Sequence, residues 1–157
     1  MNGFQRILVA TDFGESSAAA VDMAIDLATK FDAELTVAHV YEPPVPYDSG
    51  FGYPAPMFAD LGDMAAQELA KELARVKARY PRAVSMLRTG VAWEGTLAAA
   101  QQQRADLIVL GTHGRRGISR ALLGSVAEKV VRLSPVAVLT VHGVAPSIPK
   151  AAAGEKR

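Results

Sequence analysis

The sequence predicts a doubly wound α/β fold in one domain. Short apolar runs rich in β-branched residues alternate with longer segments whose apolar residues recur at helical spacing. Strands separated by helices of about ten or more residues need crossover connections, so the sheet is expected to be largely parallel, with helices on both faces. At 157 residues, 50% of them hydrophobic, the chain has the size of one ordinary domain and can bury a continuous core.

The alternation predicts five strands and four helices. In chain order they are the strand Arg6–Ala10, a helix over 16–31, a strand over 35–40, a helix over 60–80, a strand over 83–87, a helix over 93–103, a strand over 107–110, the helix Ser125–Leu133 and a strand from Val136 to Val141. The helix over 60–80 carries an apolar stripe made of Leu69, Leu73, Val76 and Tyr80.

Two segments depart from this rhythm. The segment from Pro43 to Met57 holds five prolines, two glycines and three aromatic residues, and is not expected to form regular structure. A loop longer than about twelve residues is either a functional lid or a surface excursion, and both readings stay open. Residues 144–157 show no periodicity. We therefore expect a domain over 1–143 followed by a disordered tail over 144–157.

Composition removes several classes of function. The formal net charge is +1 with both signs mixed along the chain, so nucleic acid is not an expected partner. The chain has no cysteine, which excludes disulfides, thiolate catalysis and cysteine-ligated metals. The first apolar run meets Asp12 at once, so neither a signal peptide nor a membrane span is expected. A soluble, cytoplasmic protein is the expectation.

The ends of two strands are the first place to look for a site. In open parallel sheets, ligands bind beyond the carboxyl ends of the strands, where the winding direction reverses. Thr11 and Asp12 end the first strand, and Gly111 ends the fourth and opens the run Gly-Thr-His-Gly. An aspartate after a strand often caps the next helix or makes an Asx turn. Its functional alternative is to face a nucleotide or to help hold Mg²⁺ carried on phosphates.

A glycine-punctuated loop follows the fourth strand. Nine residues separate Gly114 from Gly124 and Ser125. Ser125 and Glu128 match a capping box, which predicts Ser125 as the N-cap of the fourth helix. The free amides and dipole of a helix N-terminus attract phosphate, and a preceding glycine lets the backbone approach an anion closely. The same loop holds three cations that are either a seat for a polyphosphate or solvated loop charges: Arg115, Arg116 and Arg120.

Other nucleotide and hydrolase motifs are missing. No Walker Gly-Lys-Ser or Gly-Lys-Thr occurs, the first strand is followed by a single glycine rather than a dinucleotide fingerprint, and no Gly-x-Ser-x-Gly elbow is present. His39, His113 and His142 lack metal-ligand spacing. We therefore assign no catalytic and no metal-ligating residue. His113 lies within the glycine loop, where it either contacts a phosphate or serves only through its backbone.

Taken together, Ile-Leu-Val-Ala-Thr-Asp at the first strand and Gly111-x2-Gly114-x9-Gly124-Ser125 resemble the ATP-binding branch of the universal stress protein family. The likeness spans almost the whole chain. It implies that ATP binds, with Mg²⁺ on its phosphates. The resemblance assigns contacts with the ribose and phosphates to Gly111, Gly114, Gly124 and Ser125, and a contribution to the nucleotide site to Asp12. It also implies that the backbone of Val40 meets adenine, and that the pocket walls comprise Ala10, Thr11, Leu110, His113, Val126 and Ala127.

The resemblance further implies the strand order 3-2-1-4-5 and a homodimer formed through the fifth strand. An apolar edge strand left open invites pairing, although the tail is an alternative cover for it. Three functions remain in view. The first is an ATP-binding regulatory protein. The second is a slow Mg-dependent ATPase, for which no residue that positions the attacking water can be named. The third is a protein–protein interaction module whose glycine loop is merely a turn.

Overall fold

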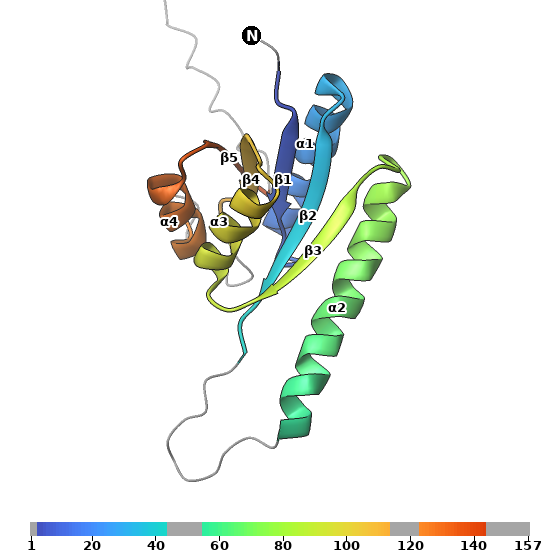
Figure 1. Ribbon diagram of the computed structural model, residues 1–157, viewed down its shortest axis with the longest axis vertical. Helices are drawn as coiled ribbons and strands as arrows, with labels where there is room; N and C mark the ends of the chain where they lie inside the picture. Colours follow the sequence, from blue (N-terminus) through green and yellow to red (C-terminus); the bar gives the residue numbers. More distant parts are fainter. Residues whose placement is uncertain (1–2, 44–54, 114–122, 144–157) are drawn as a thin grey trace, which may run out of the picture.

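The computed structural model of the chain describes residues 3–43, 55–113 and 123–143 (Figure 1). Within these residues, all strands belong to one parallel sheet with the order β3-β2-β1-β4-β5. The strands are β1 (Arg6–Ala10), β2 (Glu34–Tyr41), β3 (Val84–Thr89), β4 (Leu107–Gly111) and β5 (Ala137–Val141). The helices are α1 (Glu15–Phe31), α2 (Ala55–Lys77), α3 (Ala92–Gln102) and α4 (Ser125–Leu133). The predicted fold class and strand order are confirmed.

Helices cover both faces of the sheet, and each face has its own apolar cluster (Figure 1). Along β1, Ile7 and Val9 point to the face covered by α1 and α2, whereas Leu8 points to the face covered by α3 and α4. This alternation follows from the two-residue period of a strand. Because both faces are covered, the central strands are apolar on both sides, which explains why they appear in the sequence as continuous apolar runs.

The winding direction of the chain reverses between β1 and β4. From β1 the chain moves outward through β2 to β3, and after α3 it returns to form β4 on the other side of β1. The register pairs Ile7 with Leu107 and Val9 with Val109, so the two strands run side by side and end at the same edge. This edge is where the sequence places the candidate site.

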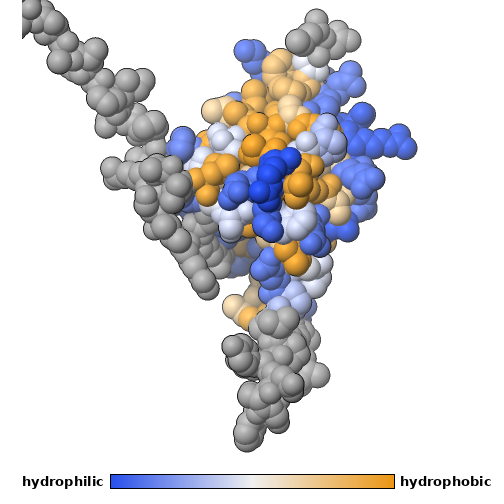
Figure 2. All heavy atoms as spheres, turned by 90° about the vertical axis from the view of Figure 1, so that its left-hand side faces the viewer, coloured by the Kyte–Doolittle hydropathy of each residue, from blue (hydrophilic) through white to orange (hydrophobic). Residues whose placement is uncertain are grey.

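Strand β5 forms one edge of the sheet and α4 lies beside it. Figure 2 views the molecule from the α4 side and shows hydrophobic residues gathered on this face. On α4, Val131 and Leu133 are 47% and 48% exposed. In the part of the chain that the structure describes, β5 pairs only with β4, so its outer backbone edge has no strand partner.

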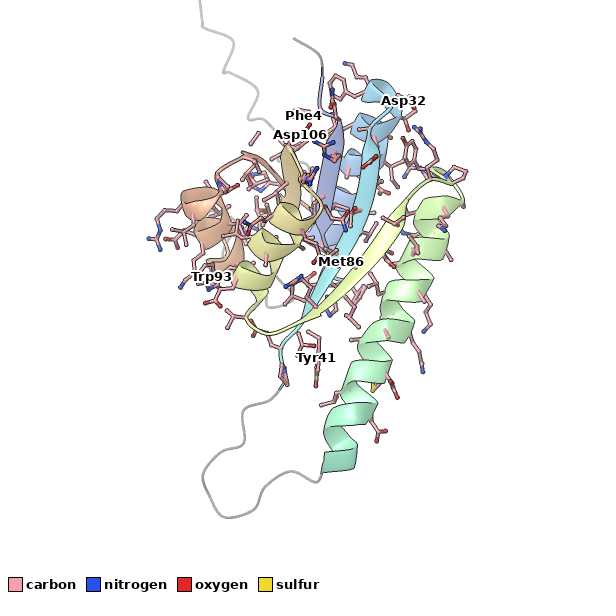
Figure 3. All side chains as sticks on the ribbon, in the orientation of Figure 1. Phe4, Asp32, Tyr41, Met86, Trp93 and Asp106 are labelled. Carbon is pink, nitrogen blue, oxygen red and sulfur yellow. The ribbon has the colours of Figure 1, made fainter. Side chains whose placement is uncertain are left out.

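Helices α3 and α4 pack against each other as well as against the sheet. Met86 of β3 and Trp93 of α3 lie on this side of the molecule (Figure 3). The Nζ of Lys129 on α4 lies 5.0 Å from the centre of the Trp93 ring, which is a cation–π geometry. Trp93 therefore connects the two helices whose first turns border the candidate site.

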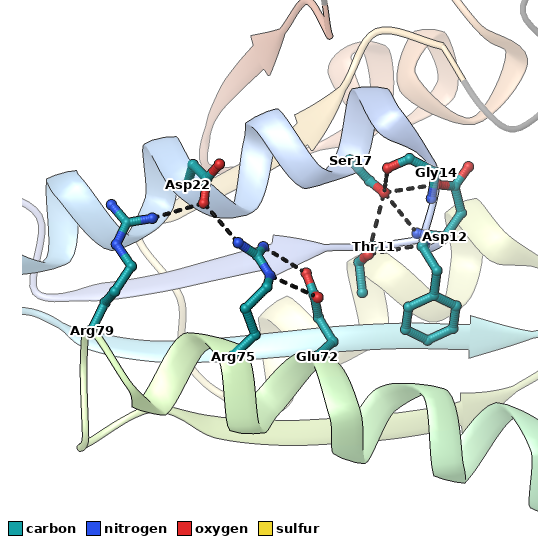
Figure 4. Close-up of polar contacts among 9 residues, drawn as sticks. Thr11, Asp12, Gly14, Ser17, Asp22, Glu72, Arg75 and Arg79 are labelled. Atoms are coloured by element: carbon teal, nitrogen blue, oxygen red, sulfur yellow. Dashed lines mark hydrogen bonds and ion pairs between the residues drawn. The ribbon is translucent and has the colours of Figure 1, made fainter.

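On the opposite face, ion pairs connect α1 to α2 (Figure 4). Asp22 lies 3.0 Å from Arg75 and 2.8 Å from Arg79, and Arg79 also reaches Asp26 at 3.0 Å. A hydrogen bond to Glu72 and the nearby Asp22 raise the pKa of Arg75 above its ordinary value. Exposed pairs of this kind stabilise a fold by only about 0–1 kcal/mol each, so they contribute little to the stability of the contact between the two helices.

Helix α2 differs from the prediction at both ends. It begins at Ala55 and includes Pro56, so the expectation of irregular structure up to Met57 was wrong for these last residues. Proline is tolerated in a first helical turn because its missing N–H would have no helical partner there. The helix ends at Lys77, yet Tyr80 remains buried and its hydroxyl donates to the carbonyl oxygen of Ala33 at 2.6 Å.

Two predicted segments lie outside the described residues, namely 44–54 and the tail over 144–157. The domain boundary at 143 therefore stays a prediction. The remaining helices and strands agree with the expected ranges to within one or two residues at each end. Among the described helices, none combines the length and the apolar composition needed to cross a membrane.

Candidate functional site

A pocket of about 140 Å³ opens at the edge of the sheet where the winding reverses. The ends of β1, β2 and β4 and the first turns of α3 and α4 surround it. Every predicted site residue that the structure describes lines this pocket, namely Ala10, Thr11, Asp12, Val40, Leu110, Gly111, His113, Gly124, Ser125, Val126 and Ala127. The other predicted members, Gly114 and Arg115, lie outside the described residues, as do Arg116 and Arg120.

The inner walls of the pocket are apolar and built largely from small residues. Ala10, Ala38 and Leu110 come from three neighbouring strands and belong to the cluster under α3 and α4. Val40 lies two residues beyond Ala38, the last residue of β2 that pairs with β1. A Cβ on Gly95 of α3 would lie 2.6 Å from a methyl carbon of Val40. Glycine at this position therefore lets α3 pack tightly against the end of β2 and holds the Val40 side chain in place.

Asp12 makes an Asx turn at the end of β1 (Figure 4). Its Oδ1 accepts hydrogen bonds from the N–H of Gly14 at 2.9 Å and from the hydroxyl of Ser17 at 2.8 Å. The turn passes through Phe13, whose φ of 63° is left-handed. Helix α1 takes Gly14 as its N-cap, so Asp12 is not the cap residue. The turn fixes the carboxylate at the rim of the pocket, and this structural role is compatible with a contact to a ligand.

Ser17 is the centre of the polar network beneath Asp12. It is buried, and its Oγ lies 3.2 Å from the Thr11 hydroxyl and donates either to Asp12 Oδ1 or to the Gly14 carbonyl oxygen at 3.0 Å. Thr11 Oγ1 also accepts from the N–H of Phe13 at 3.0 Å. These bonds hold the β1 to α1 connection rigid at the point where it borders the pocket.

Gly111 is required by the packing of α1 against β4. A Cβ on Gly111 would lie 2.6 Å from Ser16 Oγ and 2.7 Å from the Ser16 carbonyl carbon. Contacts under about 3.0 Å between such atoms force a displacement, and here the obstacle includes main chain. The sequence assigned this glycine to ligand contact alone. The structure adds a second reason for it, on the side of the strand that faces α1.

Helix α4 begins differently from the prediction. Its N-cap is Gly124, with φ −61° and ψ 155°, and no side chain of the described residues caps it. The prediction of Ser125 as the N-cap in a capping box with Glu128 was wrong, because Ser125 is already the first helical residue. The Gly124 carbonyl accepts from the N–H of Glu128 at 2.8 Å, and its own N–H donates to the Thr112 carbonyl at 2.6 Å. The helix N-terminus thus borders the pocket without a side-chain cap.

Two of the three histidines meet at the buried side chain of Thr112. Thr112 Oγ1 lies 2.9 Å from Nδ1 of His113 and 3.1 Å from Nδ1 of His142. The Nε2 atom of His113 is buried and has no hydrogen-bond partner within the described part of the chain. His39 is placed differently: its Nδ1 lies 2.8 Å from the Thr11 carbonyl oxygen. Among the described residues, no group of three or more His, Cys, Asp or Glu is arranged to hold a metal ion.

Sequence reasoning missed five residues that line the pocket: Ser17, Ala38, Ala92, Thr96 and Thr112. Thr112 and Ala38 had a usable signal, since one follows Gly111 directly and the other lies two positions before Val40 on the same face of a strand. Ala92 and Thr96 come from the first two turns of α3, which the sequence did not connect to the site. The Thr96 hydroxyl donates to the Ala92 carbonyl at 2.8 Å, so that wall is largely apolar in character.

The fold and the pocket define the class of protein, a doubly wound α/β domain with a pocket at the reversal of strand order. Residues 3–142 match the model of the universal stress protein family. The chain belongs to this family.

Relatives and solved structures agree with this assignment. A universal stress protein of Thermus aquaticus is 35% identical over 141 residues, which cover 88% of this chain and 99% of the relative. The universal stress protein UspA of Lactobacillus plantarum has a similar structure, with a TM-score of 0.73, 28% identity, and coverage of 88% of this chain and 98% of that one. A universal stress protein solved in complex with cAMP is 31% identical, with a TM-score of 0.65 and coverage of 90% and 99%.

Proposed function

We propose that this universal stress protein is a regulatory protein that binds ATP in the pocket between β1 and β4. The observation that carries the proposal is the convergence of the described candidate residues on one pocket at the reversal of the sheet. Family membership and a relative solved in complex with cAMP support an adenine nucleotide as the ligand class. Each part of such a nucleotide finds a matching part of the pocket.

The apolar end of the pocket suits a purine base. Ala38, Val40 and Leu110 provide flat apolar contact, and α3 closes this end with Ala92 and Thr96. Val40 lies beyond the last β2 residue that β1 pairs with, so its backbone groups on that side are not used in pairing with β1. We assign the contact with adenine to the backbone of Val40 and the contact with ribose to Asp12, whose Asx turn holds its carboxylate at the rim.

The opposite end of the pocket suits phosphates. The amides that begin α4 after Gly124, at Ser125 and Val126, have no side-chain cap among the described residues, and a helix N-terminus favours an anion. Among the described residues that line the pocket, Asp12 is the single carboxylate. A Mg²⁺ ion bound with ATP would therefore take most of its oxygen ligands from phosphates and water, with Asp12 as the protein side chain able to reach it.

Calorimetric titration with Mg-ATP tests the proposal. We expect the wild type to bind, and Gly124→Val to bind at least about tenfold more weakly, because a branched side chain would stand where phosphate oxygens approach the helix amides. Gly62→Ala is the matched control, since a Cβ at Gly62 meets no atom within 4 Å. Absence of binding by the wild type refutes the function. Equal binding by Gly124→Val refutes the placement of the phosphates. Titrations with cAMP and AMP compare the ligands.

We also propose a homodimer formed through β5. The Val141 carbonyl accepts from the Thr112 N–H at 3.0 Å, so Val141 faces β4 and the neighbouring Thr140 turns its backbone groups to the open edge. Thr140→Pro removes one outward N–H, a substitution that an edge strand tolerates. Sedimentation analysis should show a dimer for the wild type and for Thr140→Val, which keeps the N–H, and a monomer for Thr140→Pro. A dimer that survives Thr140→Pro contradicts this interface.

A further inference from the structure

The hydroxyl of Thr112 lies between two imidazole rings. Thr112 is only 2% exposed, and its Oγ1 is within hydrogen-bond distance of Nδ1 of both His113 and His142. His113 comes directly after Thr112 beyond β4, whereas His142 follows the last residue of β5. The three side chains therefore connect the pocket to the end of the edge strand.

One hydroxyl proton cannot serve both rings. Thr112 Oγ1 can donate to a single acceptor, and each neutral imidazole carries a proton on only one of its nitrogens. If Thr112 donates to His113, then His142 must donate its Nδ1–H to Thr112, and the proton of His113 lies on Nε2. If the bonds run the other way, Nε2 of His113 is a bare acceptor. Whenever the Thr112 hydroxyl donates to one of the two rings, the tautomers of the two histidines are thus coupled through it.

The two rings differ in what surrounds their other nitrogen. His142 is an exposed residue. His113 lines the pocket, and its buried Nε2 has no hydrogen-bond partner among the residues that the structure describes. Its main chain is also fixed, because the His113 N–H donates to Ser16 Oγ at 3.3 Å. A buried polar atom without a partner is costly, and at the wall of a pocket a ligand atom can provide the missing partner.

We propose that Thr112 and His142 are positioning residues that keep the proton of His113 on Nε2, so that this N–H donates to a phosphate oxygen of the bound nucleotide. A phosphate oxygen is an acceptor only, so it pairs with an N–H at Nε2 and is repelled by a lone pair there. The N-terminus of α4, which has no side-chain cap among the described residues, borders the same pocket and favours the same anion. The inference rests on the proposed nucleotide function and adds two residues to it.

Matched pairs of variants test whether Thr112 and His142 position the proton of His113. Thr112→Val removes the hydroxyl and keeps the shape, whereas Thr112→Ser keeps the hydroxyl. His142→Leu removes the ring donor, whereas His142→Asn places an amide N–H near the position of Nδ1. Calorimetry with ATP and with adenosine gives the ratio of their affinities, which reports on the phosphates. We expect this ratio to fall about tenfold in Thr112→Val and His142→Leu, the loss of one charge-assisted hydrogen bond, and to hold in Thr112→Ser and His142→Asn.

The tautomer itself is measured by long-range ¹H–¹⁵N NMR of the imidazole rings, above the usual titration range of histidine. In the ATP complex of the wild type, His113 should show the proton on Nε2, and His142→Leu should lose this preference in the free protein. If the wild type binds ATP and His142→Leu keeps both its affinity ratio and its His113 tautomer, the positioning role is refuted while the proposed function stands. A wild type that binds no ATP refutes the proposed function and the phosphate contact with it.

Discussion

Replacing Gly111 with alanine separates a packing role from a ligand role. The added Cβ would lie 2.6 Å from Ser16 Oγ and 2.7 Å and 2.9 Å from the carbonyl carbon and oxygen of Ser16. The hydroxyl can rotate away, but the Ser16 carbonyl belongs to the first turn of α1, so that turn or the end of β4 must move. Overpacking of this kind costs about 1–3 kcal/mol. For a domain of this size that lowers the melting temperature by about 2–12 °C.

The measurement is thermal unfolding of the ligand-free protein, followed by circular dichroism. Gly62→Ala on α2 is the control, because its Cβ meets no atom within 4 Å and alanine is the better helix former by about 1 kcal/mol. We expect Gly111→Ala to lower the free energy of unfolding and Gly62→Ala to raise it. If the glycine served a ligand alone, Gly111→Ala would be as stable as the wild type without nucleotide, and that result would refute the packing argument.

Three further changes test other parts of the fold. Tyr80→Phe leaves the buried Ala33 carbonyl without its donor, and urea unfolding should show a loss of about 1–3 kcal/mol; no loss would contradict the role of this bond. Gly95→Ala pushes against a methyl group of Val40, so it should weaken ATP binding, and adding Val40→Ala should restore part of the affinity. Asp106→Ala removes the carboxylate that accepts hydrogen bonds from two backbone N–H groups at the start of β1. It should lower the free energy of unfolding by about 1 kcal/mol in the same assay, and an unchanged free energy would contradict the role of these bonds.

The sequence predicted the fold because the apolar period changes at nearly every connection. Strands buried on both faces appear as short apolar runs, and α1 appears as an alanine-rich segment with helical spacing. The order of the strands did not follow from the period, and it came from the resemblance to the family. The start of α2 was missed because prolines were taken as a sign of irregular structure, although Pro56 occupies the first turn, where proline fits.

The residues of the pocket were predictable where the strand-end rule applies and less so elsewhere. Thr11, Asp12 and Gly111 follow from that rule. Thr96 comes from a helix whose place over β2 depends on the return of the chain across the sheet, and no local pattern reports that return. The prediction of the N-cap of α4 was wrong for a related reason. Its position is set by the bond from the Gly124 N–H to the Thr112 carbonyl, two residues that lie on opposite sides of a loop.

The glycine motif therefore serves two purposes that a sequence pattern cannot separate. Gly111 is required by the close approach of α1 in the ligand-free protein, and Gly124 is the N-cap of α4. A chain that had lost its ligand would still need the first of them for stability. The motif alone is consequently weaker support for ATP binding than its spacing suggests. Features that packing does not require bear more directly on a ligand, such as the Nε2 of His113 at the pocket wall, which has no partner among the described residues.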